Sequence, residues 1–175
     1  MSDIDLLKYS DEVDKSLGVA GMAIALLACE GENYIAYVSV EDGDETITFA
    51  PEAFFSGNPR FSAKIAWLQT MKDYQIFSGI IFGNILCRNI AAKREMPGNM
   101  LDVMRQLIAD HGIKDCALDE DEVVELFDKD LLYFRRLFNH PAVADVARDL
   151  ATTLRMQRRM TAGEVFENLR RLSAI

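Results

Sequence analysis

The chain has 175 residues, of which 50% are hydrophobic, and its 28 acidic and 19 basic side chains give a net charge of -9. A chain of this length usually folds as one domain, and its apolar content argues against disorder. The negative charge argues against nucleic-acid binding over the whole surface, because such proteins need a basic face to displace counterions from phosphate. We therefore expect a single globular domain over residues 1–175, without a linker.

The expected compartment follows from the N-terminus and the cysteines. The first 18 residues carry five acidic side chains against two lysines, unlike the positive, apolar start of a secretory signal. Cys29, Cys87 and Cys116 are odd in number and widely spaced, which favours reduced, buried thiols over a disulfide framework. The most apolar stretch, Ile76–Cys87, is shorter than the ~20 residues of a membrane-spanning helix. These features predict a cytoplasmic protein with no membrane partner.

The first element is expected to be helical. Apolar residues recur every three to four positions from Leu6 to Leu27, and Gly31 follows as a stop signal. The spacing predicts a helix from Asp3 to Glu30, either continuous or broken near Ser10. A strand over Val19–Ala28 is the alternative, which the alanines in that segment disfavour.

A small β-hairpin is expected next. Two segments rich in β-branched and aromatic residues, Tyr34–Val40 and Glu45–Phe49, lie on either side of Asp42-Gly43. The pattern predicts one hairpin at about residues 34–49. An isolated two-stranded ribbon is marginal in water, so this one must pack on helices or pair with a second hairpin across a dimer interface.

The longest helical segment, Ser62–Met96, is apolar on all sides in its middle, so we expect other elements to surround it. Gly79 and Gly83 lie four residues apart and would let a neighbouring helix approach closely. The predicted fold class is therefore mainly α: a single-domain helical bundle around a long central helix, about residues 62–96, with one small hairpin at about 34–49.

Four shorter helices are predicted after the central one, each opened by a capping residue or a proline. Their opening residues are, in chain order, Asn99, Asp119, Pro141 and Thr161. The first of these helices is expected to end at His111-Gly112, a typical stop signal. In the second and the last, a glutamate three residues after the capping residue completes a capping box.

The sequence contains few residues suited to catalysis, since only two histidines are present. His111 with Asp115, Cys116 and Asp119 offers atoms that bind zinc, but the spacing matches no paired metal motif. A helix-terminal imidazole followed by a turn is the favoured interpretation. Acids around Cys116 and the apolar helix around Cys87 disfavour thiolates, so we expect no catalytic residue, metal or cofactor.

Two segments are candidate contact sites. Their residues are Phe54, Phe55 and Arg60 in an aromatic loop, and Arg155, Arg158 and Arg159 before the last helix. The aromatic loop could grip a ligand or partner, or it could close the core. The arginines could hold phosphate as part of a helix-turn-helix, or they could meet an acidic surface.

The leading functional hypothesis is a non-catalytic protein that acts through protein–protein contact, with another protein or as a homo-oligomer. High apolar content, an open-edged hairpin and segregated charge all suit association. The alternative is a small-anion-binding protein or enzyme with a pocket near residues 54–61, where Arg60 would recognise the anion. Nucleic-acid binding through the C-terminal arginines ranks third.

Overall fold

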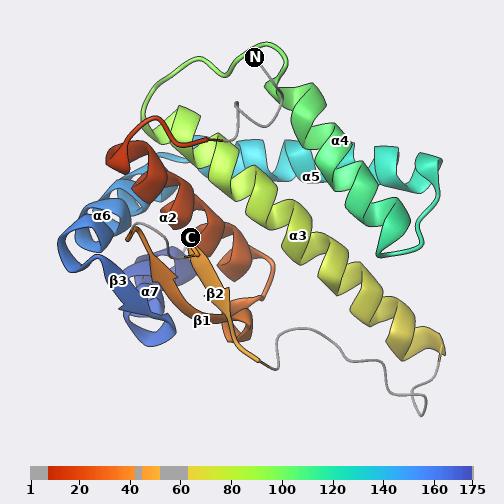
Figure 1. The fold of residues 1–175 in the computed structure, drawn as a ribbon, viewed down its shortest axis with the longest axis horizontal. Helices are drawn as coiled ribbons and strands as arrows, with labels where there is room; N and C mark the ends of the chain where they lie inside the picture. The colour runs from red at the N-terminus through yellow and green to blue at the C-terminus, as the bar shows by residue number, and fades with distance from the viewer. Residues whose placement is uncertain (1–7, 42–44, 52–62, 175) are drawn as a thin grey trace.

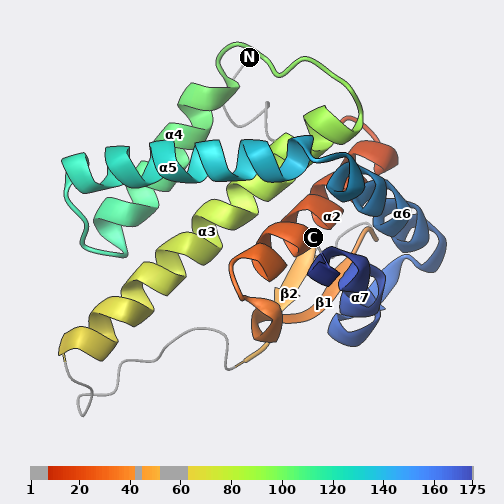
Figure 2. The same ribbon diagram turned by 180° about the vertical axis from the view of Figure 1, so that it is seen from behind.

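The computed structural model describes residues 8–41, 45–51 and 63–174. Within these ranges six α-helices and a three-stranded antiparallel sheet confirm the predicted mainly helical, single-domain class (Figure 1, Figure 2). The helices are α2 (Glu12–Ala28), α3 (Ala63–Ala91), α4 (Met100–Lys114), α5 (Glu120–Asn139), α6 (Pro141–Gln157) and α7 (Ala162–Leu169). The strands are β1 (Ile35–Ser39), β2 (Ile47–Phe49) and β3 (Arg159–Thr161), and two 3-10 segments are η1 (Glu32–Tyr34) and η2 (Arg170–Ala174). Among the described helices, none combines the length and apolarity needed to cross a membrane.

The long helix α3 runs diagonally through the fold, and α2 packs along it (Figure 1). The two backbones touch at a pair of glycines: a β-carbon built on Gly21 would lie 2.0 Å from the carbonyl oxygen of Gly83. A β-carbon on Gly83 would lie 2.4 Å from the carbonyl oxygen of Gly21. The close approach expected at Gly83 is therefore confirmed, whereas Gly79 faces the sulfur of Cys29.

A buried ion pair fixes the start of α2 against the end of α3. Residues 8–11 are not helical, in agreement with the predicted break near Ser10, and Asp11 caps the helix. Asp14 is 2% exposed and accepts hydrogen bonds from Arg88 Nε at 3.0 Å and Nη2 at 2.5 Å. Burial acts to raise the pKa of Asp14, but hydrogen bonds from Arg88 and Ser10 and the charges of Arg88 and Arg94 lower it overall.

The predicted hairpin at about residues 34–49 is confirmed as β1 and β2, and a third strand that the sequence did not predict, β3, extends it to a sheet in the order β2-β1-β3. Val38 of β1 pairs with Ile47 of β2 on one side and with Met160 of β3 on the other. The chain turns back after α6 at Arg158, which has a φ of 68. Val40 N–H donates a hydrogen bond to the Arg158 carbonyl oxygen at 2.9 Å, and β3 continues from there alongside β1. The support that a two-stranded ribbon needs thus comes from within the chain.

The starts of the later helices are confirmed. Capping boxes join Asp119 to Glu122 at α5 and Thr161 to Glu164 at α7, and a proline opens α6. The Asn99 side chain, however, makes no capping hydrogen bond at the start of α4.

The predicted end of α4 at His111-Gly112 is wrong, since the helix continues to Lys114. Gly112 therefore lies inside the helix and does not end it. Glycine suits this position because an added β-carbon would lie 2.8 Å from Val123 and 3.1 Å from Tyr74. On α5, Val123 is buried and Val124 is 52% exposed.

The expectation that the apolar middle of α3 is surrounded holds only in part. Ile76, Phe82 and Ile85 are buried, but Phe77 and Ile80 remain partly exposed. These two residues face an open pocket.

Candidate functional site

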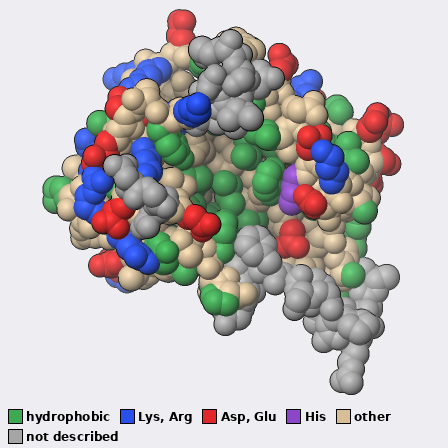
Figure 3. Space-filling view, in the orientation of Figure 1, with side chains coloured by type: hydrophobic (Ala, Val, Ile, Leu, Met, Phe, Trp, Pro, Cys, Tyr) green, Lys and Arg blue, Asp and Glu red, His purple; other side chains and the backbone are tan. Residues whose placement is uncertain are grey.

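A pocket of about 600 Å³ lies across α3, between β2 on one side and the C-terminal end of α4 on the other. Figure 3 shows it as a hollow with an apolar floor, with a histidine in one wall and carboxylates nearby. The lining residues are Met22, Glu45, Thr46, Ile47, Phe49, Asp73, Ile76, Phe77, Ile80, His111, Asp115 and Cys116. The pocket therefore joins segments that lie far apart in the chain.

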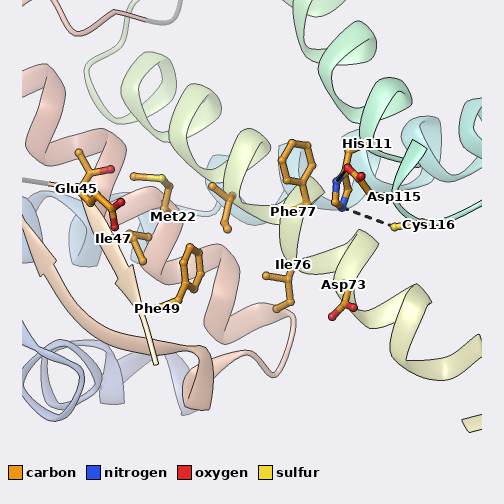
Figure 4. A pocket seen from close by; sticks show the side chains of 12 residues that line it. Met22, Glu45, Ile47, Phe49, Asp73, Ile76, Phe77, His111, Asp115 and Cys116 are labelled. Carbon is orange, nitrogen blue, oxygen red and sulfur yellow. Dashed lines mark hydrogen bonds and ion pairs between the residues drawn. The ribbon is translucent and has the colours of Figure 1, made fainter. Parts of the chain in front are cut away.

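The apolar part of the lining follows from simple helix and strand geometry. Ile76 and Ile80 lie four residues apart on α3 and share one face of that helix. Ile47 and Phe49 lie two residues apart on β2 and share one face of the sheet. These two faces look toward each other across the pocket, with Met22 of α2 between them (Figure 4).

The polar end of the pocket lies at the end of α4. His111 Nδ1 lies 2.8 Å from Asp115 Oδ2, one helical turn later, and His111 Nε2 lies 3.7 Å from Cys116 Sγ. The imidazole also stacks on Phe77 of α3, with ring centroids 4.0 Å apart and planes inclined by 23°. Figure 4 shows the imidazole between Phe77 and the thiol, so carboxylate, imidazole and thiol form a continuous chain of contacts.

Negative charge surrounds this end of the pocket. Burial raises the pKa of Cys116 to about 11, and the charges of Asp73 and Asp115 add to the shift. Glu45 lies at the opposite, β2 side. Among the described lining residues there is no lysine or arginine. At neutral pH Cys116 is therefore a protonated thiol in an acidic environment.

The sequence named His111, Asp115, Cys116 and Asp119 as a conceivable zinc group. The structure brings the first three together, while Asp119 instead caps α5. In the part of the chain that the structure describes, no group of three or more such side chains is arranged to hold a metal ion. The predicted helix stops at Gly112, so it does not place His111 and Asp115 one helical turn apart. A helix that continues to Lys114 does.

Of the six candidate contact residues, the three that the structure describes, Arg155, Arg158 and Arg159, are not among the described lining residues of this pocket. Phe54, Phe55 and Arg60 lie outside the described residues.

The C-terminal arginines contact their own chain. Arg158 pairs with Glu12 of α2 at 2.6 Å, and the guanidinium of Arg159 lies 3.5 Å above the ring of Tyr37. Arg155 donates to a threonine hydroxyl one turn earlier at 3.3 Å. Basic and acidic segments thus meet within one molecule.

A second, smaller pocket of about 230 Å³ lies between α3 and α5 and is lined in part by Cys29 and Asp130. Burial raises the pKa of Asp130, although the Ser78 hydroxyl donates to its carboxylate at 2.7 Å. Burial likewise raises the pKa of Cys29 to about 11. This pocket contains no imidazole among its described lining residues, and the Cys29 thiol instead contacts the backbone carbonyl of Gln75.

Comparison with protein families, with curated proteins and with solved structures finds no match for this chain. The class of site therefore follows from the geometry of the pocket alone. That geometry is a mainly apolar pocket with an acidic margin and a carboxylate, an imidazole and a thiol in contact at one end.

Proposed function

We propose that the protein binds a small molecule with an apolar body and a neutral or positively charged head group in the pocket across α3. The observation that carries this proposal is the pocket itself, about 600 Å³ in volume with an apolar floor. Ligand pockets are typically ~300–1,000 Å³, mainly apolar, with a few polar groups that orient the ligand.

Charge selects the head group. Asp73 and Asp115 lie at the α4 end of the pocket, and Glu45 lies at its β2 side. Carboxylates attract a cation and repel an anion, and no basic side chain of the described lining offsets them. The alternative drawn from the sequence, an anion held by Arg60, involves a residue outside the described ranges and is less favoured by this lining.

A matched ligand series tests the proposal. Octylamine, octanol and octanoate share one chain length and differ in head-group charge, so calorimetry below their micelle concentrations separates apolar from electrostatic binding. We expect octylamine and octanol to bind and octanoate to bind least. Ile80→Gln, which places a polar side chain in the pocket wall, should weaken all three ligands.

Two further variants isolate the charge contribution. Asp73→Asn should reduce the preference for octylamine over octanol, because it removes one of the lining carboxylates. Asp145→Asn is the matched control, since this exposed carboxylate lies on α6 away from the described lining. Absence of binding by all three ligands, or binding that Ile80→Gln leaves unchanged, would contradict the proposal.

Self-association, the leading hypothesis from the sequence, is the second candidate. Trp67 and Leu68 near the start of α3 are 47% and 58% exposed, and neighbouring large apolar side chains on a surface suit a protein contact. Light scattering over a range of concentrations should show a dimer that Trp67→Glu converts to a monomer. A clean monomer at every concentration would refute this candidate.

Two further proposals concern the location of the protein and nucleic-acid binding. The three free thiols, Cys29, Cys87 and Cys116, support a reducing, cytoplasmic location, which fractionation of expressing cells would test. Nucleic-acid binding stays the weakest candidate because Arg158 and Arg159 already contact Glu12 and Tyr37. A binding assay at low salt would test it.

A further inference from the structure

We propose that Cys116, His111 and Asp115 form a nucleophilic site, in which Cys116 attacks the carbonyl carbon of a neutral or cationic ester whose apolar acyl chain lies in the pocket. This inference rests on the proposed binding function, because the pocket must hold the acyl chain next to the thiol.

The contacts have the order that such chemistry requires. In the neutral imidazole, His111 Nδ1–H can donate to Asp115 Oδ2 at 2.8 Å, and in that tautomer Nε2 is the acceptor. The thiol of Cys116 lies 3.7 Å from that Nε2, within reach of a hydrogen bond to sulfur. A nucleophile beside a base that a third group orients is the recognisable pattern of covalent catalysis.

The imidazole is held in place at the pocket. Its ring stacks on Phe77, with centroids 4.0 Å apart, and Phe77 itself lines the apolar floor. His111, Asp115 and Cys116 all line the pocket as well. An acyl chain lying on Ile76 and the Phe77 ring would therefore place its carbonyl end beside the thiol and the imidazole (Figure 4).

The surroundings of the thiol determine how it could react. Asp73 of α3 and Asp115 of α4 face Cys116, and burial with these charges raises the pKa of the thiol to about 11. The buried hydroxyl of Tyr74 also lies within electrostatic range of Cys116. A preformed thiolate is therefore disfavoured, and the thiol needs His111 as a general base during attack.

The proposed reaction is ester hydrolysis with water as co-reactant. As the Cys116 sulfur bonds to the carbonyl carbon, the thiol proton moves to His111 Nε2. The bond from the carbonyl carbon to the alcohol oxygen then breaks, and the alcohol takes that proton. Water next gives a proton to Nε2 and its oxygen bonds to the acyl carbon, after which the carbon–sulfur bond breaks and the sulfur regains the proton. The products are a carboxylic acid, an alcohol and the original enzyme.

The acidic margin restricts the leaving group. Asp73 and Asp115 would repel an anionic alcohol portion and accept a neutral or cationic one. The released carboxylic acid, once ionised, would be repelled by the same carboxylates, which favours product release.

The first experiment follows acylation directly. Wild-type protein is incubated with 4-nitrophenyl hexanoate, and release of 4-nitrophenol is recorded together with the intact mass. We expect one hexanoyl group on Cys116, located by peptide mapping and removed by neutral hydroxylamine. Cys116→Ala should lose this adduct, and His111→Gln should slow acylation by about 10²-fold or more.

Controls separate this chemistry from general thiol reactivity and from misfolding. Cys29→Ala should acylate at the wild-type rate, because the Cys29 thiol contacts a backbone carbonyl and not an imidazole. Circular dichroism verifies that each variant is folded. The side chain of Asp115 is 65% exposed, so Asp115→Asn should fold normally and slow acylation by about 10-fold or more. Asp115→Glu, which keeps the carboxylate, should restore most of the rate.

Acylation of another residue while Cys116 stays unmodified would overturn the proposal, as would equal rates in wild type, His111→Gln and Asp115→Asn. Absence of both an adduct and catalysed 4-nitrophenol release, while octylamine and octanol still bind, would refute the nucleophilic site alone. Absence of both the adduct and ligand binding would refute the proposed function as well.

Discussion

Substitution of Gly21 by alanine should strongly destabilise the protein, although alanine is the better helix former. The added β-carbon would lie 2.0 Å from the Gly83 carbonyl oxygen, whereas ordinary contact begins at 3.4 Å, so the helices would have to separate by 1.4 Å. The clash is with backbone, which cannot rotate away, and the same atom would lie 2.3 Å from the Cys87 β-carbon. Overpacking typically costs ~1–3 kcal/mol or more, and the gain in helix propensity is at most ~1 kcal/mol.

Separation of α2 from α3 also weakens packing along their whole contact, since a gap of 0.5–1 Å already loses roughly a quarter to a half of the dispersion energy. We therefore expect the free energy of unfolding to fall by about 2 kcal/mol or more. Urea unfolding followed by circular dichroism measures it. Gly163→Ala in α7 is the matched control: its β-carbon meets nothing within 4 Å. That variant should gain about 0.5–1 kcal/mol. A Gly21→Ala protein as stable as wild type would refute the reasoning.

Three further substitutions give separate tests by urea unfolding. Asp14→Asn removes the negative charge that faces the buried Arg88 guanidinium and should cost about 3–5 kcal/mol at neutral pH. Because folding lowers the pKa of Asp14, the stability difference between wild type and Asp14→Asn should shrink as the pH falls below 3.8, the ordinary pKa of an aspartate. A difference that stays the same in acid would contradict the prediction. Ala117→Gly should raise stability by about 0.5–1 kcal/mol, because Ala117 has a φ of 52 in the turn between α4 and α5; a lower midpoint would contradict this. Burial raises the pKa of Asp130, so Asp130→Asn, whose amide oxygen can still accept from Ser78, should stabilise the protein at neutral pH. This gain in stability should vanish as the pH falls through the raised pKa to 3.8, and an unchanged gain in acid would contradict the prediction.

Features that depend on one turn of helix were predictable from the sequence. The glutamates of both capping boxes lie three residues after Asp119 and Thr161, and their bonds satisfy free backbone groups without any distant partner. Close approach of a neighbouring helix at Gly83 was also predictable, although not which helix, because a glycine in an apolar helix weakens that helix unless a neighbour comes close.

The third strand was not predictable by the same means. β3 has three residues, of which only Met160 is buried, so it has no alternation from which to predict a strand. Its position depends on the left-handed turn at Arg158 and on a β1 edge supplied by a distant part of the chain. An arginine is a poor signal for such a turn, which glycine adopts far more readily.

The pocket was hidden for a related reason. Ile76 and Phe77 are adjacent in one apolar stretch, yet the first is buried and the second is partly open, because β2 and α4 stand apart where they flank α3. Composition cannot distinguish an apolar side chain that packs from one that lines a pocket, since both obey the same helical period.

The same limit applies to the reactive end of the pocket. The acidic neighbours of Cys116 in the sequence disfavour a thiolate, and burial together with the charges of Asp73 and Asp115 raises the pKa of this thiol and keeps it protonated. Because His111 Nε2 lies 3.7 Å from the Cys116 sulfur, however, a protonated thiol is a suitable starting state: the imidazole can remove its proton as the sulfur bonds to the carbonyl carbon. Whether Cys116 is inert or reactive thus depends on the imidazole contact more than on its charge environment, and His111→Gln removes that contact while leaving Asp73 and Asp115 in place.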